Sequence, residues 1–196
     1  MGNGAITKDR ILQVALDIFA HHGFEGARME KIASEVGINK ASLYFHFKSK
    51  EDIFRELFHS ILLKYRSKIK LIIVEKKDLP VKQRLTAIYK DYLKYNWNNI
   101  EMDFWNRMYY FPPEMMRDEI IQETIDAENA FVASLTGVFE EGIQKKDIRP
   151  GNANHMAKTY YYLLTCIGLS VDIMNQDQGL IDMENCFGVF WEGIKG

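Results

Sequence analysis

The sequence has few cysteines and few prolines. Among 196 residues there are 2 Cys, 4 Pro and 13 Gly. So little Pro and Gly excludes a collagen-like or low-complexity chain. Two cysteines without a CxxC pair make neither a disulfide framework nor a zinc motif. We therefore expect a globular protein without metal or cofactor, in which Cys166 and Cys186 are free thiols packed in helices.

Long apolar runs are also absent. Runs such as residues 61–63 and 71–74 fall far short of the roughly 20 residues that a membrane-spanning helix needs. The charged pair Lys8-Asp9 comes before any apolar stretch, which excludes a secretory signal over these residues. We expect a soluble, cytoplasmic protein without a membrane partner.

Neither sign of charge dominates the chain, since 25 Lys and Arg stand against 27 Asp and Glu. This balance argues against a uniformly basic nucleic-acid binder. The charges are unevenly distributed, however. Residues 1–70 carry 12 basic and 8 acidic residues, a net charge of +4, whereas residues 71–196 carry 13 and 19, a net charge of −6. A basic N-terminal module on an acidic remainder suits local contact with phosphates.

Apolar residues recur at helical spacing along nearly the whole chain. The pattern predicts an all-α protein of about nine helices, with no strand pair. One long helix is expected from residue 52 to about 74, and another from about 114 to 146. Asp78 is expected to cap the helix that follows it, with Pro80 in its first turn.

Residues 29–47, MEKIASEVGINKASLYFHF, have the spacing of a helix-turn-helix. Ala33 is small where two helices approach, Gly37 stands where the backbone must become left-handed, and Leu43 faces inward. Asn39 is a good N-cap for the second helix. Taken alone, any tight corner between two helices could produce this spacing.

Residues 6–60 resemble the N-terminal domain of the TetR family of transcriptional repressors. The run LYFHFKSKEDIF, residues 43–54, is typical of that family, and residues 32–38 precede it at the expected distance. The resemblance implies a three-helix DNA-binding domain at residues 1–50. A long helix would join it to a helical effector-binding and dimerisation domain at residues 51–196, which matches the family only in length and helical character.

The first residues of a recognition helix point into the major groove, which predicts base contacts from residues 39–42. By resemblance, Tyr44 and His46 hold the DNA backbone, and Lys50 adds a phosphate contact. Most family members have Thr or Ser at the start of the second helix, where this chain has Ala27-Arg28. A cap and a hydroxyl contact are thereby lost, and Arg28 could supply a charged contact instead. The candidate DNA-binding residues are Arg28, Asn39, Lys40, Ala41, Ser42, Tyr44, His46 and Lys50.

Structural roles are open for several residues of this segment. Lys40 and Lys48 could be solvated surface charges, and His46 could be a packed histidine. We expect Phe45 and Phe47 to belong to the core rather than to contact DNA.

Nine of the 25 aromatic residues lie between Tyr89 and Phe111. Such a stripe can be core, but its density and the asparagines within it also fit an apolar pocket with few polar groups. In the TetR family the C-terminal domain commonly binds a small, often apolar or aromatic effector. The candidate ligand-binding residues are Tyr89, Tyr92, Trp97, Phe104, Trp105, Met108 and Tyr109.

Two apolar stripes near the C-terminus suggest a dimer interface, because the family usually pairs two helices from each subunit. The alternative is that they form only the core of one protomer. A two-fold homodimer would read a pseudo-palindromic operator on double-stranded DNA. The candidate interface residues are Val132, Leu135, Phe139, Tyr160, Leu164 and Ile167.

The leading hypothesis is a homodimeric repressor that a small, largely apolar effector releases from its operator, with the helix from residue 52 as transmitter. One alternative keeps the DNA binding without an effector. Another is an all-α enzyme, but no Gly-rich phosphate loop, nucleophile elbow or HExxH motif is present. We therefore expect no enzymatic activity and no catalytic residues.

Overall fold

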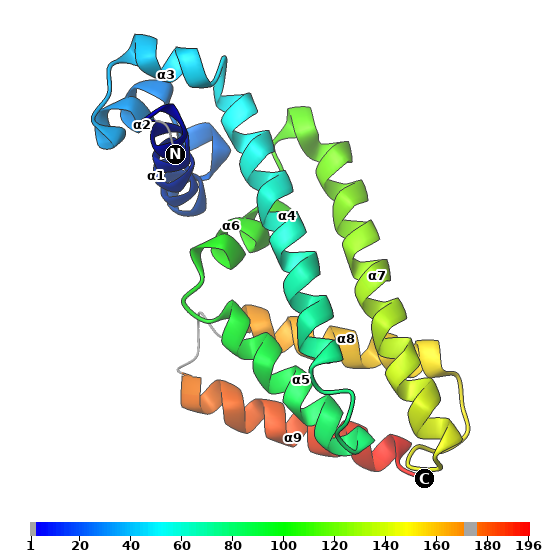
Figure 1. The fold of residues 1–196 in the computed structure, drawn as a ribbon. Coiled ribbons are helices and arrows are strands. Elements are labelled where there is room, and N and C mark those ends of the chain that lie inside the picture. The colour runs from blue at the N-terminus through cyan, green and yellow to red at the C-terminus, as the bar shows by residue number, and fades with distance from the viewer. Residues whose placement is uncertain (1–2, 171–175) are drawn as a thin grey trace. The chain divides into compact units, whose positions relative to one another are not determined.

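The computed structural model describes residues 3–170 and 176–196, and this part of the chain is helical almost throughout (Figure 1). No strand occurs in it; residues 148 and 195 form an isolated β-bridge. Nor does it hold a helix long and apolar enough to cross a membrane. The elements are α1 (Asn3–Gly26), α2 (Met29–Val36), α3 (Lys40–His46), α4 (Lys50–Val74), α5 (Val81–Asn96), α6 (Ile100–Tyr110), the 3-10 helix η1 (Glu114–Met116), α7 (Arg117–Gln144), α8 (Ala153–Ser170) and α9 (Gln176–Ile194).

The chain forms two compact units. Unit 1 comprises residues up to 64 together with residues 99–123, and unit 2 comprises residues 65–98 and 124–196. Helix α6 therefore belongs to the same unit as the helix-turn-helix segment. The sequence divides the chain by expected function, into a DNA-binding domain at residues 1–50 and an effector-binding and dimerisation domain at residues 51–196. The two compact units do not test that division, which stays a prediction.

The core of unit 1 is aromatic. Phe54 of α4 lies edge-on to Phe19 of α1, with ring centroids 5.3 Å apart, and 5.4 Å from Phe104 of α6. All three side chains are fully buried. Burial of this much apolar area drives the three helices together, since a buried Phe is worth roughly 1.5–3 kcal/mol.

The break in α1 is held by a side chain from α6. Gly23 has φ +71°, so the helix loses its regular backbone there. Arg107 donates from Nε to the carbonyl of Ala20 at 2.9 Å and from Nη2 to that of His21 at 3.3 Å. An interruption of this kind deprives carbonyls of the preceding turn of helical donors, and the guanidinium donates to two carbonyls of that turn.

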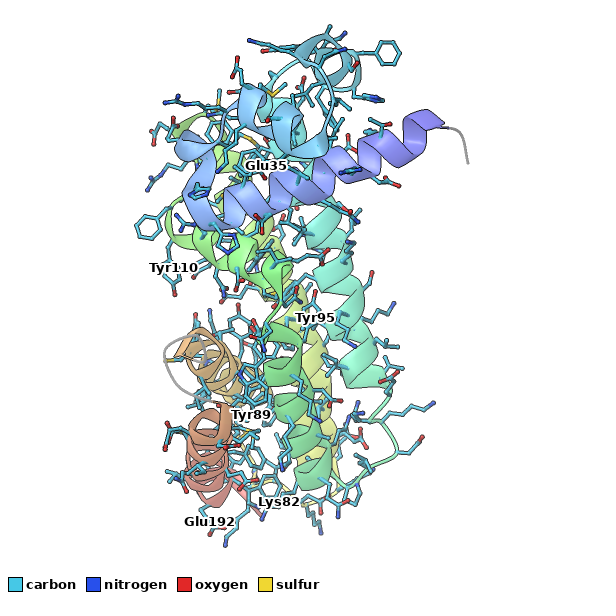
Figure 2. The ribbon with its side chains drawn as sticks, turned by 90° about the vertical axis from the view of Figure 1, so that its left-hand side faces the viewer. Glu35, Lys82, Tyr89, Tyr95, Tyr110 and Glu192 are labelled. Atoms are coloured by element: carbon cyan, nitrogen blue, oxygen red, sulfur yellow. The ribbon has the colours of Figure 1, made fainter. Side chains whose placement is uncertain are left out.

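The core of unit 2 surrounds Tyr89, which points from α5 toward the two C-terminal helices (Figure 2). Its ring centroid lies 5.7 Å from that of Tyr160 and 6.4 Å from that of Phe187. Its hydroxyl donates to the carbonyl of Leu163 at 2.9 Å. Burial raises the pKa of the Tyr89 hydroxyl, which therefore stays a neutral donor.

Two local expectations are wrong, one for Asp78 and one for the cysteines. Asp78 does not cap α5, because the helix begins at Val81 and Pro80 occupies the N-cap position without a side-chain hydrogen bond. The long helix expected from about residue 114 to 146 is present as α7, Arg117–Gln144, directly after the 3-10 helix η1. Cys166 and Cys186 form no disulfide with any described residue, and both are exposed rather than packed.

Candidate nucleic-acid interface

The turn between α2 and α3 has the predicted backbone. Gly37 has φ +80° and ψ 31°, which is left-handed, and its N–H donates to the carbonyls of Ala33 and Ser34. The N–H of Ile38 also donates to the Ala33 carbonyl, at 3.0 Å. These bonds close the end of α2 and redirect the chain into α3. Leu43, fully buried, anchors α3 against the core.

Asn39 caps α3 as predicted. Its Oδ1 accepts from the backbone N–H of Ser42 at 2.8 Å, and its own backbone is extended. The side-chain oxygen is thereby engaged within the helix. Helix α2, by contrast, begins after Arg28 without a side-chain cap, as the Ala27-Arg28 sequence predicts. Arg28 is exposed, so its guanidinium is accessible to a phosphate.

Lys40 is already paired within the chain. Its Nζ bonds to the carboxylate of Glu30 on α2, and it lies 5.8 Å from the centre of the Tyr44 ring. The hydrogen bond with Glu30 raises the pKa of Lys40, and the same bond lowers that of Glu30. Both side chains are more than half exposed, so the pair adds little stability. Its main effect is to bring a carboxylate beside the cation expected to contact DNA.

Lys50 is more firmly engaged. Its Nζ donates to the backbone carbonyl of Phe24 at 2.8 Å and lies 4.0 Å from the centre of that ring. This charged hydrogen bond joins the start of α4 to the end of α1. The structure therefore gives Lys50 a positioning role that the sequence did not indicate, while its phosphate contact stays a prediction.

The other residues of α3 differ in exposure. Ala41 and Tyr44 are exposed, whereas Ser42 and His46 are half-buried. Phe47 is core as expected, with 4% exposure. The expectation for Phe45 is wrong, because its side chain is 81% exposed. A seven-residue helix can bury one narrow face, and Phe45 lies about 200° around α3 from Leu43.

These features define a helix-turn-helix domain of the DNA-binding type: two short helices, a left-handed glycine between them, and a capped second helix with an exposed outer face. Residues 11–57 match the family described as bacterial regulatory proteins, tetR family.

Among curated proteins, the biofilm operon icaADBC HTH-type negative transcriptional regulator IcaR of Staphylococcus epidermidis is 41% identical over 49 residues. The aligned part is 25% of this chain and 26% of that protein, so the chain matches about a quarter of this relative's length.

Solved structures are similar over nearly the entire chain. A candidate tetR-family transcriptional regulator from Mesorhizobium loti has a TM-score of 0.77 at 17% identity, over 100% of both chains. A candidate transcriptional regulator from Saccharomonospora viridis in complex with choline has a TM-score of 0.76 at 20% identity, over 98% of this chain and 99% of that one. The predicted resemblance to the TetR family is thus confirmed, by sequence over residues 11–57 and by fold beyond them.

The candidate ligand-binding residues are divided between the two compact units. Tyr89, Tyr92 and Trp97 belong to unit 2, whereas Phe104, Trp105, Met108 and Tyr109 belong to unit 1. Phe104, Trp105 and Met108 are buried in the core of unit 1, and Tyr109 is half-exposed. Trp105 stacks on Phe58 with 4° between the ring planes. Their part in ligand binding stays a prediction.

Within unit 2, Tyr92 and Trp97 have polar groups in a buried setting. The hydroxyls of Tyr92 and Tyr65 share a hydrogen bond, and burial raises the pKa of Tyr92 to about 12. Asn96, also buried, donates to the Tyr92 carbonyl at 2.8 Å. The indole Nε1 of Trp97 is buried and has no hydrogen-bond partner among the described residues. An unsatisfied buried donor costs about 1–3 kcal/mol, which a bound acceptor would recover.

The candidate dimer-interface residues are mostly core. Val132, Leu135, Phe139, Tyr160 and Leu164 are each at most 6% exposed within one protomer, and only Ile167 is partly exposed. Five of the six therefore cannot contribute exposed surface to a second copy in this conformation. The sequence pattern marks a buried face but cannot say which element covers it. Apolar side chains that do remain exposed on α8 and α9 are Tyr162, Ile181 and Val189.

Replacement of Gly37 by Ala should lower the free energy of unfolding by about 1–2 kcal/mol, because an L-residue is strained at φ +80°. No atom lies within 4 Å of the added Cβ, so the cost is conformational. Gly137→Ala is the matched control. That site is helical and equally open, so this change should raise stability by about 0.5–1 kcal/mol. Chemical denaturation measures the free energy of unfolding of both variants. If both substitutions change it in the same direction, the left-handed backbone assigned to Gly37 is contradicted.

Replacement of Lys50 by Met should destabilise the protein by about 1–2 kcal/mol, because the Phe24 carbonyl loses a charged donor and its ring loses a cation. Lys48→Met, at an exposed lysine in the loop just before α4, should change stability by less than about 0.5 kcal/mol. Thermal unfolding without DNA distinguishes the two. If the variants unfold at the same temperature, Lys50 does not join α4 to α1.

Proposed function

We propose that the protein is a sequence-specific DNA-binding transcriptional regulator, a homodimeric repressor that a small effector releases from its operator. One observation carries the proposal: α2 and α3 meet at a left-handed Gly37, with α3 anchored by Leu43 and its outer face exposed. That arrangement can present the second helix to a major groove. The description of IcaR as a negative transcriptional regulator supports repression.

The DNA-binding proposal is tested by fluorescence anisotropy against duplexes selected in vitro from a random pool with the full-length protein. We expect a selected pseudo-palindrome and an affinity that falls steeply with salt. Lys40→Ala should alter preference mainly at one base pair, whereas Tyr44→Phe should weaken binding about equally across sequences. Failure to enrich any sequence would overturn the proposal.

An effector site in unit 2 is the finer part of the proposal. The indole N–H of Trp97, which has no partner among the described residues, favours a ligand with a hydrogen-bond acceptor. The tyrosine cluster of the same unit, in which Tyr65 interacts with Tyr92, Tyr95 and Tyr161, favours an apolar or aromatic body. The structural relative in complex with choline supports the idea that this fold accommodates a small organic molecule.

We expect one of a panel of small aromatic acids, aromatic amides and choline to weaken DNA binding and to change tryptophan fluorescence. Trp97→Phe should weaken that ligand about tenfold, because it removes only the donor. Trp191→Phe, at a tryptophan near the C-terminus, is the control and should leave affinity unchanged. If no ligand in the panel affects DNA binding, the alternative of a regulator without an effector gains support.

The homodimer is proposed to form through the exposed sides of α8 and α9, where Val189 is 78% exposed. A carboxylate placed in an apolar interface is strongly unfavourable. Val189→Asp should therefore produce monomers in sedimentation velocity and weaken operator binding, with little change in the secondary structure of the chain. An unchanged dimer would remove this surface from the proposal.

A further inference from the structure

The outer edge of α3 is apolar. Successive residues of an α-helix are separated by about 100°, so Ala41 and Phe45, one turn apart, both lie roughly opposite the buried Leu43. Ala41 is exposed and Phe45 is 81% exposed. The centre of the face that would enter a groove therefore presents a methyl group and a phenyl ring.

The polar residues beside this edge are engaged elsewhere. Asn39 Oδ1 accepts from the backbone of Ser42 at 2.8 Å, and the Lys40 ammonium bonds to Glu30. The ring of Phe45 lies edge-on to that of its neighbour His46, with ring centroids 5.4 Å apart. This contact leaves most of the phenyl ring in solvent.

The helix-turn-helix segment also carries exposed basic residues, which favours nucleic acid over an apolar protein partner. Arg28 and Lys48 are both exposed, one just before α2 and the other just after α3. Exposed cations in the same segment as an apolar strip suit a groove, where phosphates border the base edges. In the major groove the apolar group is the 5-methyl of thymine, which Ala and Phe side chains contact.

We propose that Ala41 and Phe45 recognise thymine 5-methyl groups in each operator half-site. The inference rests on the proposed function, and it names the base chemistry that the second helix reads. One helical turn advances about 5.4 Å and one base pair about 3.4 Å, so the two side chains would meet thymines one or two base pairs apart. Recognition is then by apolar contact more than by hydrogen bonds.

The test uses the duplex selected with the wild-type protein, with single thymines replaced by deoxyuridine, which lacks only the methyl group. We expect one or two positions per half-site at which the replacement weakens wild-type binding about three- to tenfold, as burial of one methyl implies. Deoxyuridine at flanking positions outside the half-sites should have no effect and serves as the DNA control.

The protein arm uses Phe45→Ala and Phe45→Leu. Phe45→Ala should weaken binding to the thymine duplex and lose its sensitivity to deoxyuridine at one position, whereas Phe45→Leu should retain most of both. Because the ring is exposed, neither variant should alter the unfolding temperature appreciably. Full sensitivity to deoxyuridine in Phe45→Ala would overturn the assignment of Phe45.

The outcomes separate this inference from the proposed function. Selection of a sequence whose binding is indifferent to every deoxyuridine overturns methyl recognition and leaves the DNA-binding regulator intact. Selection of no sequence overturns the proposed function itself. Selection of half-sites without thymine also overturns the inference.

Discussion

The anchoring of a seven-residue helix is the constraint on which the rest of the interface depends. Helix α3 is too short to be stable alone, because helices below about 12–15 residues are marginal in water. Burial of Leu43, the turn at Gly37 and the cap from Asn39 hold it in place. Since one face is committed to the core, the opposite residues must face solvent or a partner.

Some basic residues of unit 1 hold helices together and others lie at its surface, and the sequence does not distinguish the two kinds. Lys50 of α4 and Arg107 of α6 both donate to backbone carbonyls of α1, and so hold α4 and α6 against that helix. Lys40 pairs with Glu30 at the surface instead. The net positive charge of the N-terminal segment therefore overstates the number of cations that are available to bind phosphate.

Most of the fold was predictable, because helical spacing and the Gly37 and Asn39 signals depend on local backbone preferences. Expectations about burial were less reliable, because the surroundings of a residue come from segments distant in the sequence. Phe45 was expected in the core from its apolar character, yet Leu43 occupies the one buried face of α3. Val132 and Leu135 lie on an apolar stripe from which the sequence predicts a dimer interface, with the core of one protomer as the alternative. The structure buries both within one protomer, and their part in a dimer stays a prediction.

The sequence by itself determined the all-α class, the positions of the α2–α3 turn and cap, and the family resemblance of residues 11–57, because each depends on neighbours within a few residues. Tertiary structure decided which aromatics are core, which cations are paired, and that residues 99–123 join the N-terminal unit. The reason is physical: burial and pairing depend on what another element brings into contact. Spacing along one helix specifies a face but not what covers it.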